Sequence, residues 1–368
     1  MLEFQTSYNT RKTILALGAE SVGNFSIFRD GNIVYSSDFG SLSDHANFNN
    51  LTNSTSATLK KDKLRPDYLL IDLHPEFSTV EFAEKLSKKY KAKIVRVQHH
   101  VAHIFASVGE DEILRGNKAP SEFIGIACDG TGYGEDGNIW GGEVLEFRMQ
   151  NAECRSVKRI GHLENQVLLG GEQAIIEPAR MLISVLAKIL EKDEVFGFVK
   201  KYFTRNEFEL LFGQLQQGFN CFQTSSTGRI LDAVAVLLGF FEKKVTHKHE
   251  AVIVLENNST TPYALKPKII SGDINILDTT YLFAYLLKNI QKDKKRLAAT
   301  AQKYLAEGLF RIAQKNKLKI YAAGGMTNNK IISDYFASKK IVLNTKLARG
   351  DGTLSFGQMV YGLKQGLK

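Results

Sequence analysis

The sequence is poor in cysteine and has no long apolar run. Its three cysteines, Cys128, Cys154 and Cys221, stand far apart and form no Cys-x-x-Cys pair, which argues against a disulfide framework and against a cysteine zinc site. We therefore expect all three to be reduced packing residues. The longest apolar run, residues 233–241, falls far short of the roughly 20 residues that span a bilayer, so we expect no membrane partner.

The sequence also shows neither a secretory signal nor a basic surface typical of nucleic-acid binding. Residues 1–12 are polar and lack an apolar core, so we expect a cytoplasmic protein. Lysine and arginine outnumber the acidic residues, 48 to 39. This excess lies in lysine-rich helical stretches, residues 85–93 and 292–296, which favour solvated helix faces over a nucleic-acid interface. Attraction of an anionic substrate stays open.

The 368 residues are enough for two domains with full cores, and no low-complexity linker divides them. The expected order of the first part is three strands in a meander, a strand, a helix and a strand, at residues 13–18, 24–29, 32–36, 68–73, 78–89 and 94–97. After residue 122 the order of strand, glycine turn and strand begins again, with a third strand at 157–162, which suggests a duplicated fold. We expect an N-terminal lobe of residues 1–121 and a C-terminal lobe of residues 122–368, joined through a cleft. The final helix, residues 353–368, would pack back on the first lobe.

Helices are expected through the middle of the second lobe. Pro178 suits the first position of a helix over residues 178–190, and Thr204 with Glu207 forms a capping box that opens another. Helical periodicity continues in three further stretches, residues 230–241, 279–291 and 296–315. Strands at 319–323 and 341–343 would precede the closing helix.

One glycine-dense stretch follows the apolar run 123–128, which has the pattern of a buried strand. It reads Asp129-Gly-Thr-Gly-Tyr-Gly and continues to Ile139-Trp-Gly-Gly-Glu143. Glycine lets backbone N–H groups approach a ligand closely, so a glycine turn at a strand end is a candidate anion cradle. An ordinary glycine-rich hairpin would look the same, and the stretch alone does not separate the two.

Two histidines, His99 and His103, are spaced one helical turn apart. If a helix follows the strand at 94–97, Val101, Ile104 and Phe105 share its apolar face and the two imidazoles lie opposite. This spacing is typical of the first half of a metal site. A solvent-exposed histidine face is the alternative, and His100 lies to the side of the pair.

Two aspartates are candidates to complete such a site. Asp129 opens the glycine-dense stretch, and Asp351 stands in Arg349-Gly-Asp-Gly-Thr353. Asp351 also fits the N-cap of the final helix, where aspartate is favoured. The two roles are compatible if one carboxylate oxygen caps the helix and the other binds metal.

Two further segments have weaker patterns. The strand ending at Ala323 runs into Gly324-Gly325 and then a helix, a junction where a base or a phosphate could lie against bare backbone. Residues 224–232 offer hydroxyls at a helix start, with Arg229 and Asp232 on one face. Without context this second segment favours a capping cluster with a surface ion pair.

The motifs together resemble the C-terminal, Kae1-like domain of the HypF carbamoyltransferases, which are hydrogenase maturation factors. The matching stretches are Val97-Gln-His-His-Val-Ala-His103, Asp129-Gly-Thr-Gly-Tyr-Gly with Ile139-Trp-Gly-Gly-Glu143, Thr224-Ser-Ser-Thr-Gly-Arg with Leu231-Asp-Ala-Val-Ala, Gly324-Gly-Met-Thr-Asn328, Asp72-Leu-His-Pro75 and Gly170-Gly-Glu-Gln-Ala174. The resemblance spans nearly the whole chain in the right order. It implies an α/β fold of the actin/Hsp70/hexokinase-like (ASKHA) type, with two lobes, duplicated RNase H-like cores and a nucleotide in the cleft.

The resemblance also implies a reaction and its site. In this family a divalent metal holds a carbamoyl-adenylate, whose carbamoyl group passes to the C-terminal cysteine thiolate of the partner HypE with release of AMP. Zinc or iron is the implied metal, with manganese and magnesium as alternatives, and the nucleotide is ATP, AMP or carbamoyl-adenylate. The implied metal ligands are His99, His103, Asp129 and Asp351. The residues implied to hold the nucleotide are Gly130, Gly132, Gly141, Gly142, Gly228, Asp232, Gly324, Gly325 and Asn328, with Gly141 and Gly142 along the phosphate.

The sequence departs from the family pattern in several places. The acylphosphatase domain, the cysteine-rich zinc region and the YrdC-like adenylate-forming domain do not precede these motifs, so we expect carbamoyl-adenylate to come from a separate YrdC-like protein. The family's Gly-Glu-Leu-Lys-Asn is here Gly18-Ala-Glu-Ser-Val-Gly-Asn24, and its Asn-Asp-Gly-Gly is Gly350-Asp-Gly-Thr353. The acceptor is therefore open. The alternatives are O-carbamoylation of a small-molecule hydroxyl and a nucleotide-binding scaffold without transferase activity.

Overall fold

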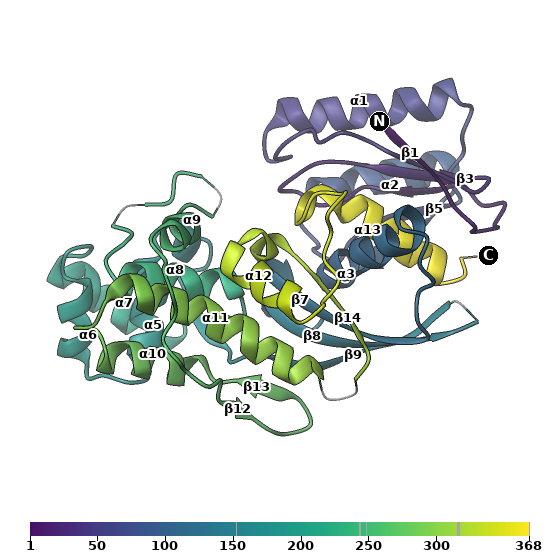
Figure 1. The fold of residues 1–368 in the computed structure, drawn as a ribbon. Helices are drawn as coiled ribbons and strands as arrows, with labels where there is room; N and C mark the ends of the chain where they lie inside the picture. The colour runs from purple at the N-terminus through teal and green to yellow at the C-terminus, as the bar shows by residue number, and fades with distance from the viewer. Residues whose placement is uncertain (152, 243, 248, 315–316, 368) are drawn as a thin grey trace.

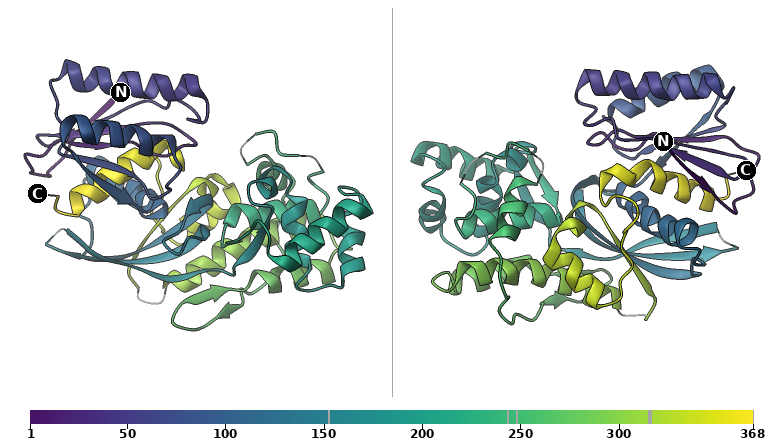
Figure 2. Two further views of the ribbon diagram at one scale, coloured as in Figure 1. Left: turned by 180° about the vertical axis from the view of Figure 1, so that it is seen from behind. Right: turned by 45° about the horizontal axis from the view of Figure 1, so that its top comes forward.

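The chain folds into two lobes, each built on a β-sheet, with two helices packed between the sheets (Figures 1 and 2). The computed structural model describes residues 1–151, 153–242, 244–247, 249–314 and 317–367. The two central helices are α3 (His99–Gly109) and α13 (Leu354–Lys364). Both chain ends lie at the first lobe, as Figure 1 shows.

The first sheet has six strands in the order β1-β4-β3-β2-β5-β6. Its strands are β1 (Leu2–Gln5), β2 (Ile14–Ala16), β3 (Ser26–Arg29), β4 (Asn32–Tyr35), β5 (Tyr68–Asp72) and β6 (Lys93–Val97). The predicted meander of β2, β3 and β4 is confirmed, and β5 and β6 join it in parallel. Strand β1 was missed because it is a short edge strand whose residues are mostly exposed, so no apolar alternation marks it. Helices α1 (His45–Lys61) and α2 (Ser78–Tyr90) cover the outer face of this sheet.

The second sheet repeats that strand order. Its core strands are β7 (Glu122–Tyr133), β8 (Ile139–Gln150), β9 (Glu153–Leu163) and β14 (Lys319–Ala323). The first three form an antiparallel meander, and β14 lies parallel to β7 as β5 lies parallel to β2. The strand predicted at 341–343 is reduced to a single parallel bridge between Val342 and Tyr321. The duplication expected from the sequence is therefore present in the topology.

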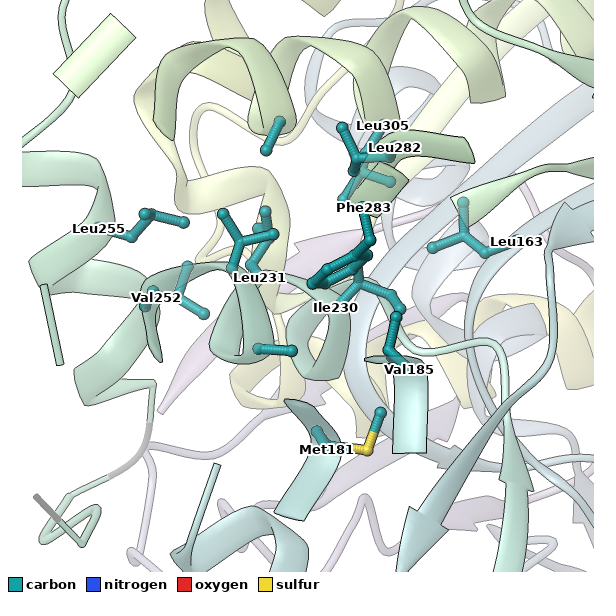
Figure 3. Close-up of a cluster of buried hydrophobic side chains, with 14 of the residues drawn as sticks. Leu163, Met181, Val185, Ile230, Leu231, Val252, Leu255, Leu282, Phe283 and Leu305 are labelled. Carbon is teal, nitrogen blue, oxygen red and sulfur yellow. The ribbon is translucent and has the colours of Figure 1, made fainter. Parts of the chain in front are cut away.

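The second lobe differs from the first by a large insertion between β9 and β14. It contains β10 (Gln166–Leu169), β11 (Cys221–Thr224), β12 (Ile269–Ile270) and β13 (Asn275–Leu277), together with α4 (Gln173–Ile176), α5 (Ala179–Leu186), α6 (Lys192–Val199), α7 (Arg205–Gln217), α8 (Thr227–Leu237), α9 (Glu250–Asn257), α10 (Thr279–Lys288) and α11 (Lys294–Ala313). Helix α12 (Lys330–Ser338) follows β14. Figure 3 shows Ile230 and Leu231 of α8 within the buried apolar cluster that these helices share.

Local signals explain where several of these helices begin. Thr204 and Glu207 form the predicted capping box of α7. Pro178 is the residue before α5 rather than its first residue, and α5 ends four residues earlier than predicted, at Leu186. Helix α8 begins three residues before the predicted start, because Ser226 caps it by accepting from the N–H of Arg229.

Helices α3 and α13 lie close together and hold the two sheets. Helix α3 packs on β7 and β14, whereas α13 packs on β2, β3 and β5. A Cβ on Gly357 of α13 would lie only 1.9 Å from the carbonyl oxygen of Ala102 in α3, so this glycine permits the close crossing. In the described part of the chain, no helix is both long enough and apolar enough to cross a lipid bilayer.

Candidate metal centre and adjoining cleft

The two histidines enter the site from the first turns of α3. Strand β6 ends at Val97, and the side chain of Gln98 caps the helix by accepting from the N–H of Val101. Every residue of α3 is buried, including His99 and His103. A solvent-exposed histidine face is therefore excluded, because the side opposite the apolar stripe is covered by the glycine-dense hairpin.

Asp129 lies where β7 bulges before turning into β8. The pairing of β7 with β8 shifts between Cys128 and Gly132, which turns the Asp129 side chain toward the histidines. One carboxylate oxygen, Oδ1, accepts from the backbone N–H groups of Gly130 at 2.8 Å and Gly325 at 3.1 Å. These two bonds aim the other oxygen, Oδ2, at the imidazoles.

Asp351 reaches the same point from the turn before α13. It begins a 3₁₀ turn, η4 (Asp351–Thr353), and the N-cap of α13 is Thr353. The suggested capping role of Asp351 is therefore wrong, since the intervening 3₁₀ turn moves the helix start two residues along. The Ser21 hydroxyl, in the β2–β3 hairpin of the first lobe, donates to Asp351 Oδ2.

The four predicted ligands meet at one point. The ligand atoms of His99, His103, Asp129 and Asp351 all lie within 4.8 Å of one another. His103 Nε2 lies 3.2 Å from both Asp129 Oδ2 and Asp351 Oδ1, and the corresponding distances from His99 Nε2 are 3.4 and 3.6 Å. The histidine pair, Asp129 and Asp351 come from three separate parts of the sequence, so only the fold brings them together.

The hydrogen bonding of this cluster fits a cation. Asp129 Oδ2 is buried without a hydrogen bond, although both imidazoles are near it. His99 Nε2 and His103 Nε2 face one another at 3.2 Å, an arrangement that needs a shared proton or a shared metal. Two imidazole nitrogens and two carboxylate oxygens form a donor set that suits zinc, iron or manganese.

The charges of the cluster reinforce that fit. Burial alone would lower the pKa of His99, but the neighbouring carboxylates, led by Asp72, raise it well above its ordinary value. Burial likewise opposes a charged His103, yet Asp129 raises the pKa of this imidazole. Burial would raise the pKa of Asp129, but chiefly His103 holds it well below its ordinary value. A divalent cation would take the place of the protons that these imidazoles otherwise hold.

Sequence reasoning missed the role of Asp72 beside the cluster. Its Oδ2 lies 2.7 Å from His99 Nδ1, the ring nitrogen that faces away from the other ligands. A carboxylate in this place fixes the tautomer and orientation of a metal-binding imidazole. Its position at the end of a buried parallel strand, directly before Leu73-His74-Pro75, was the available signal.

His100 is not a member of the cluster, as expected. Its ring stacks beside Trp140 with centroids 6.4 Å apart, and its Nε2 lies 3.9 Å from Asp129 Oδ2. Burial lowers the pKa of His100 well below its ordinary value. A Cβ on Gly132 would lie 2.5 Å from the His100 ring, so this glycine lets the hairpin close over the imidazoles.

A cavity of about 320 Å³ adjoins the metal cluster. His99, Asp129 and Asp351 form one part of its wall, and Arg229 and Asp232 of α8 form another. The remaining wall comes from both lobes: Ala19, Glu20, Ser21, Ser41, Ser43, Phe77, Gly130, Thr131, Ile175, Val245, His249 and Glu250. The cavity is therefore a cleft between the lobes with a cluster of metal-type ligands in its wall.

The ion pair of Arg229 and Asp232 is buried, not on the surface as the isolated segment suggested. The two side chains are 5% and 2% exposed, and their nearest atoms are 2.8 Å apart. Burial raises the pKa of Asp232 against the opposing influence of Arg229. The segment was misread because the hairpin that covers α8 comes from nearly a hundred residues earlier in the chain.

The N–H groups of Gly141 and Gly142, expected to lie along a phosphate, are used within the protein. Their N–H groups donate to the buried side chain of Glu143, at 3.1 and 3.2 Å. Glu143 also pairs with Arg159 at 2.6 Å. A Cβ on Gly141 would lie 2.7 Å from the backbone oxygen of Asp129, so these glycines allow close packing rather than leave their amides open to the cleft.

The other glycines predicted to hold a nucleotide pack around Asp129. A Cβ on Gly228 would lie 2.9 Å from Gly130 Cα, and one on Gly324 would lie 2.4 Å from the backbone oxygen of Cys128. Gly324 has a φ of +99°, which favours glycine. Asn328 lies in the 3₁₀ turn η3 (Gly325–Asn328), is exposed, and donates to the backbone oxygen of Arg349.

Comparisons with known proteins agree with this architecture. Residues 125–358 match the family described as carbamoyltransferase, Kae1-like domain, second subdomain, and residues 9–110 match the HypF Kae1-like domain. The fold superposes on full-length HypF in its phosphate- and nucleotide-bound form with a TM-score of 0.86 and 24% identity, covering 100% of this chain and 57% of that one. The T. kodakarensis HypF structure gives a TM-score of 0.86 and 27% identity over 99% of this chain and 49% of its own.

These matches and the duplicated sheets define a two-lobed α/β protein of the actin/Hsp70/hexokinase-like class. The chain belongs to the HypF carbamoyltransferase family through its Kae1-like domain. It is 38% identical to a probable carbamoyltransferase HypF of Methanocaldococcus jannaschii, over 98% of this chain and 48% of the relative.

The chain spans about half the length of that relative and of both HypF structures. A carbamoyltransferase HypF homolog of Cupriavidus necator has a similar extent, because the alignment covers 96% of this chain and 92% of the homolog at 29% identity.

Proposed function

We propose that this chain is the transferase part of a carbamoylation system, and that it binds a divalent cation and carbamoyl-adenylate together. The observation that supports this most is the cluster of His99, His103, Asp129 and Asp351 in the wall of the inter-lobe cavity. The cation would polarise the carbamoyl carbonyl and neutralise the adjacent phosphate. Manganese, zinc, iron and magnesium are the ions to test.

The chain's own residues would bind and orient the nucleotide. Arg229 offers a buried guanidinium, already aligned by Asp232, for the phosphate charge of an adenylate. The amides of Gly141 and Gly142 would reach a phosphate only if Glu143 released them. Asp232, Gly324, Gly325 and Asn328 remain our proposal for the ribose and base.

The transferred group would go to a thiolate. The acceptor sulfur forms a bond to the carbamoyl carbon, the bond from that carbon to the phosphate oxygen breaks, and AMP leaves with the electron pair. We propose the C-terminal cysteine of a HypE-like protein as acceptor and a YrdC-like protein as the source of carbamoyl-adenylate, in NiFe hydrogenase maturation.

The direct test is to supply carbamoyl-adenylate and a HypE-like acceptor to the manganese-loaded protein. We expect AMP release that depends on the acceptor, with the carbamoyl group found on its terminal cysteine by mass spectrometry. A parallel reaction with hydroxylated small molecules tests O-carbamoylation. AMP release with no labelled acceptor in either arm would contradict both transferase functions, and nucleotide binding by calorimetry would then support a scaffold.

A further inference from the structure

Helix α3 does not end after the histidines but widens into a π-helical turn. This turn is η1 (Glu110–Leu114), whose first residue, Glu110, is 0% exposed. Single π-helical turns are rare and occur frequently at functional sites. A buried carboxylate here needs a specific set of partners.

The partners of Glu110 are three successive backbone N–H groups in a distant loop. Its carboxylate accepts from Thr345 at 2.9 Å, from Lys346 at 3.2 Å and from Leu347 at 2.8 Å. Arg115 adds a charged contact at 2.6 Å. Burial would raise the pKa of Glu110, but these bonds together lower it, so the carboxylate is ionised.

The loop that Glu110 binds, residues 344–350, leads directly to Asp351. Hydrogen bonds within the loop and to Thr327 hold it in place. Arg349 donates from Nε to the backbone oxygen of Asn344 at 2.9 Å and from Nη1 to that of Thr327 at 2.7 Å. Asn344 donates to the backbone oxygen of Ala348 at 3.2 Å. Hydrogen bonds therefore hold the loop from Asn344 to Arg349 to Glu110 and to Thr327, and Asp351 follows two residues after Arg349.

We infer that Glu110 is a positioning residue for the metal centre, which holds Asp351 at its distance from the histidines of α3. His99, His103 and Glu110 belong to one helical run, so a loop attached to Glu110 moves with the imidazoles. The 3.2 Å separation of His103 Nε2 and Asp351 Oδ1 is then set within one rigid unit. This inference rests on the metal site proposed above.

The test compares Glu110→Gln with Asp111→Asn in Mn²⁺ titrations followed by calorimetry and electron paramagnetic resonance. Asp111 is the adjacent, equally buried carboxylate, and it binds Lys319 and Tyr321 rather than the loop. We expect Glu110→Gln to weaken Mn²⁺ binding about 10- to 100-fold, the usual effect of losing a group that orients a ligand. Asp111→Asn should leave it within about twofold of the unchanged protein.

A double-mutant cycle separates positioning from general loss of structure. In an Asp351→Ala background, Glu110→Gln should have no further effect on Mn²⁺ affinity, because Glu110 acts through that aspartate. If Glu110→Gln fails to fold, Glu110→Asp, which keeps the charge but shortens the reach, should give a smaller loss in the same direction. Equal losses in the Glu110 and Asp111 variants, or an additive cycle, would overturn the inference. Absence of Mn²⁺ binding by the unchanged protein would instead overturn the proposed metal site.

Discussion

The hairpins β2–β3 and β7–β8 occupy equivalent places in the two sheets, yet they contact the proposed metal centre differently. The second-lobe hairpin carries the proposed ligand Asp129, whose Oδ1 accepts from two backbone N–H groups. The first-lobe hairpin grips the backbone around Asp351: Asn24 donates to the backbone oxygen of Gly352 at 3.0 Å, and Ser21 donates to the Asp351 carboxylate. We propose that the two equivalent hairpins have diverged, so that the β7–β8 hairpin binds the cation and the β2–β3 hairpin supports Asp351.

The insertion increases the contrast between the lobes. In the first lobe the meander is joined to β5 by a single helix, α1, whereas the second lobe places more than 150 residues between β9 and β14. Arg229 and Asp232 belong to this insertion. The residues proposed to meet the nucleotide therefore come from the lobe that also supplies Asp129.

Asp129→Asn should reduce Mn²⁺ affinity more than any other change, because it alters the proposed ligand on the β7–β8 hairpin. The amide keeps an acceptor for the N–H groups of Gly130 and Gly325 but removes the anionic oxygen that faces the imidazoles. We expect Mn²⁺ affinity to fall more than about 100-fold, with little change in fold by circular dichroism. Asp136→Asn, in the same hairpin but hydrogen-bonded to Trp140, is the matched control. Similar affinities for the two variants would contradict the assigned ligand.

Metal removal should affect the two hairpins unequally. A cation present at 100 times its dissociation constant would stabilise the folded chain by about 2.7 kcal/mol, which chelation would remove. In hydrogen exchange, the amide of Gly130 in the β7–β8 hairpin should lose protection, since it bonds to Asp129, and so should that of Gly325 after β14. The amide of Gly18, which bonds to Gln358 at 3.0 Å, should change little. Equal loss of protection in both hairpins would contradict the division of roles.

Asp72→Ala tests whether a first-lobe strand also contributes to binding. Asp72 lies at the end of β5 and orients His99 through Nδ1. We expect Mn²⁺ binding to weaken about 10- to 100-fold, as is usual when a group that orients a metal ligand is lost. Asp67→Ala, just before the same strand and bonded to the N–H of Thr13, should leave affinity unchanged. An unchanged affinity in Asp72→Ala would show that His99 needs no orienting carboxylate.

The sequence was most informative where a local pattern and a chemical motif coincide. The glycine-dense stretch was correctly placed in a hairpin that begins with a buried strand, β7. His99 and His103 were correctly placed on one face of a helix. What could not be predicted depends on distant partners. Glu143 accepts from the N–H groups of Gly141 and Gly142 where Ser225 and Arg159 hold its carboxylate in place. Ser225 and Arg159 are distant from Glu143 in the sequence. Asp72 and Glu110 were missed because each acts on a group that another element of the fold presents.

Ser21→Ala should reduce Mn²⁺ affinity least. It therefore tests whether the β2–β3 hairpin only supports Asp351. It removes one hydrogen bond to Asp351. Asn24 still donates to the backbone oxygen of Gly352, and the N–H of Leu347 in the preceding loop still donates to Glu110. A typical net hydrogen bond contributes about 0.5–1.5 kcal/mol, so Mn²⁺ affinity should fall only about 2- to 10-fold. Ser43→Ala, on the same cavity wall, is the control. A loss as large as that of Asp129→Asn would mean that the β2–β3 hairpin also binds the cation, because a single supporting contact cannot account for it.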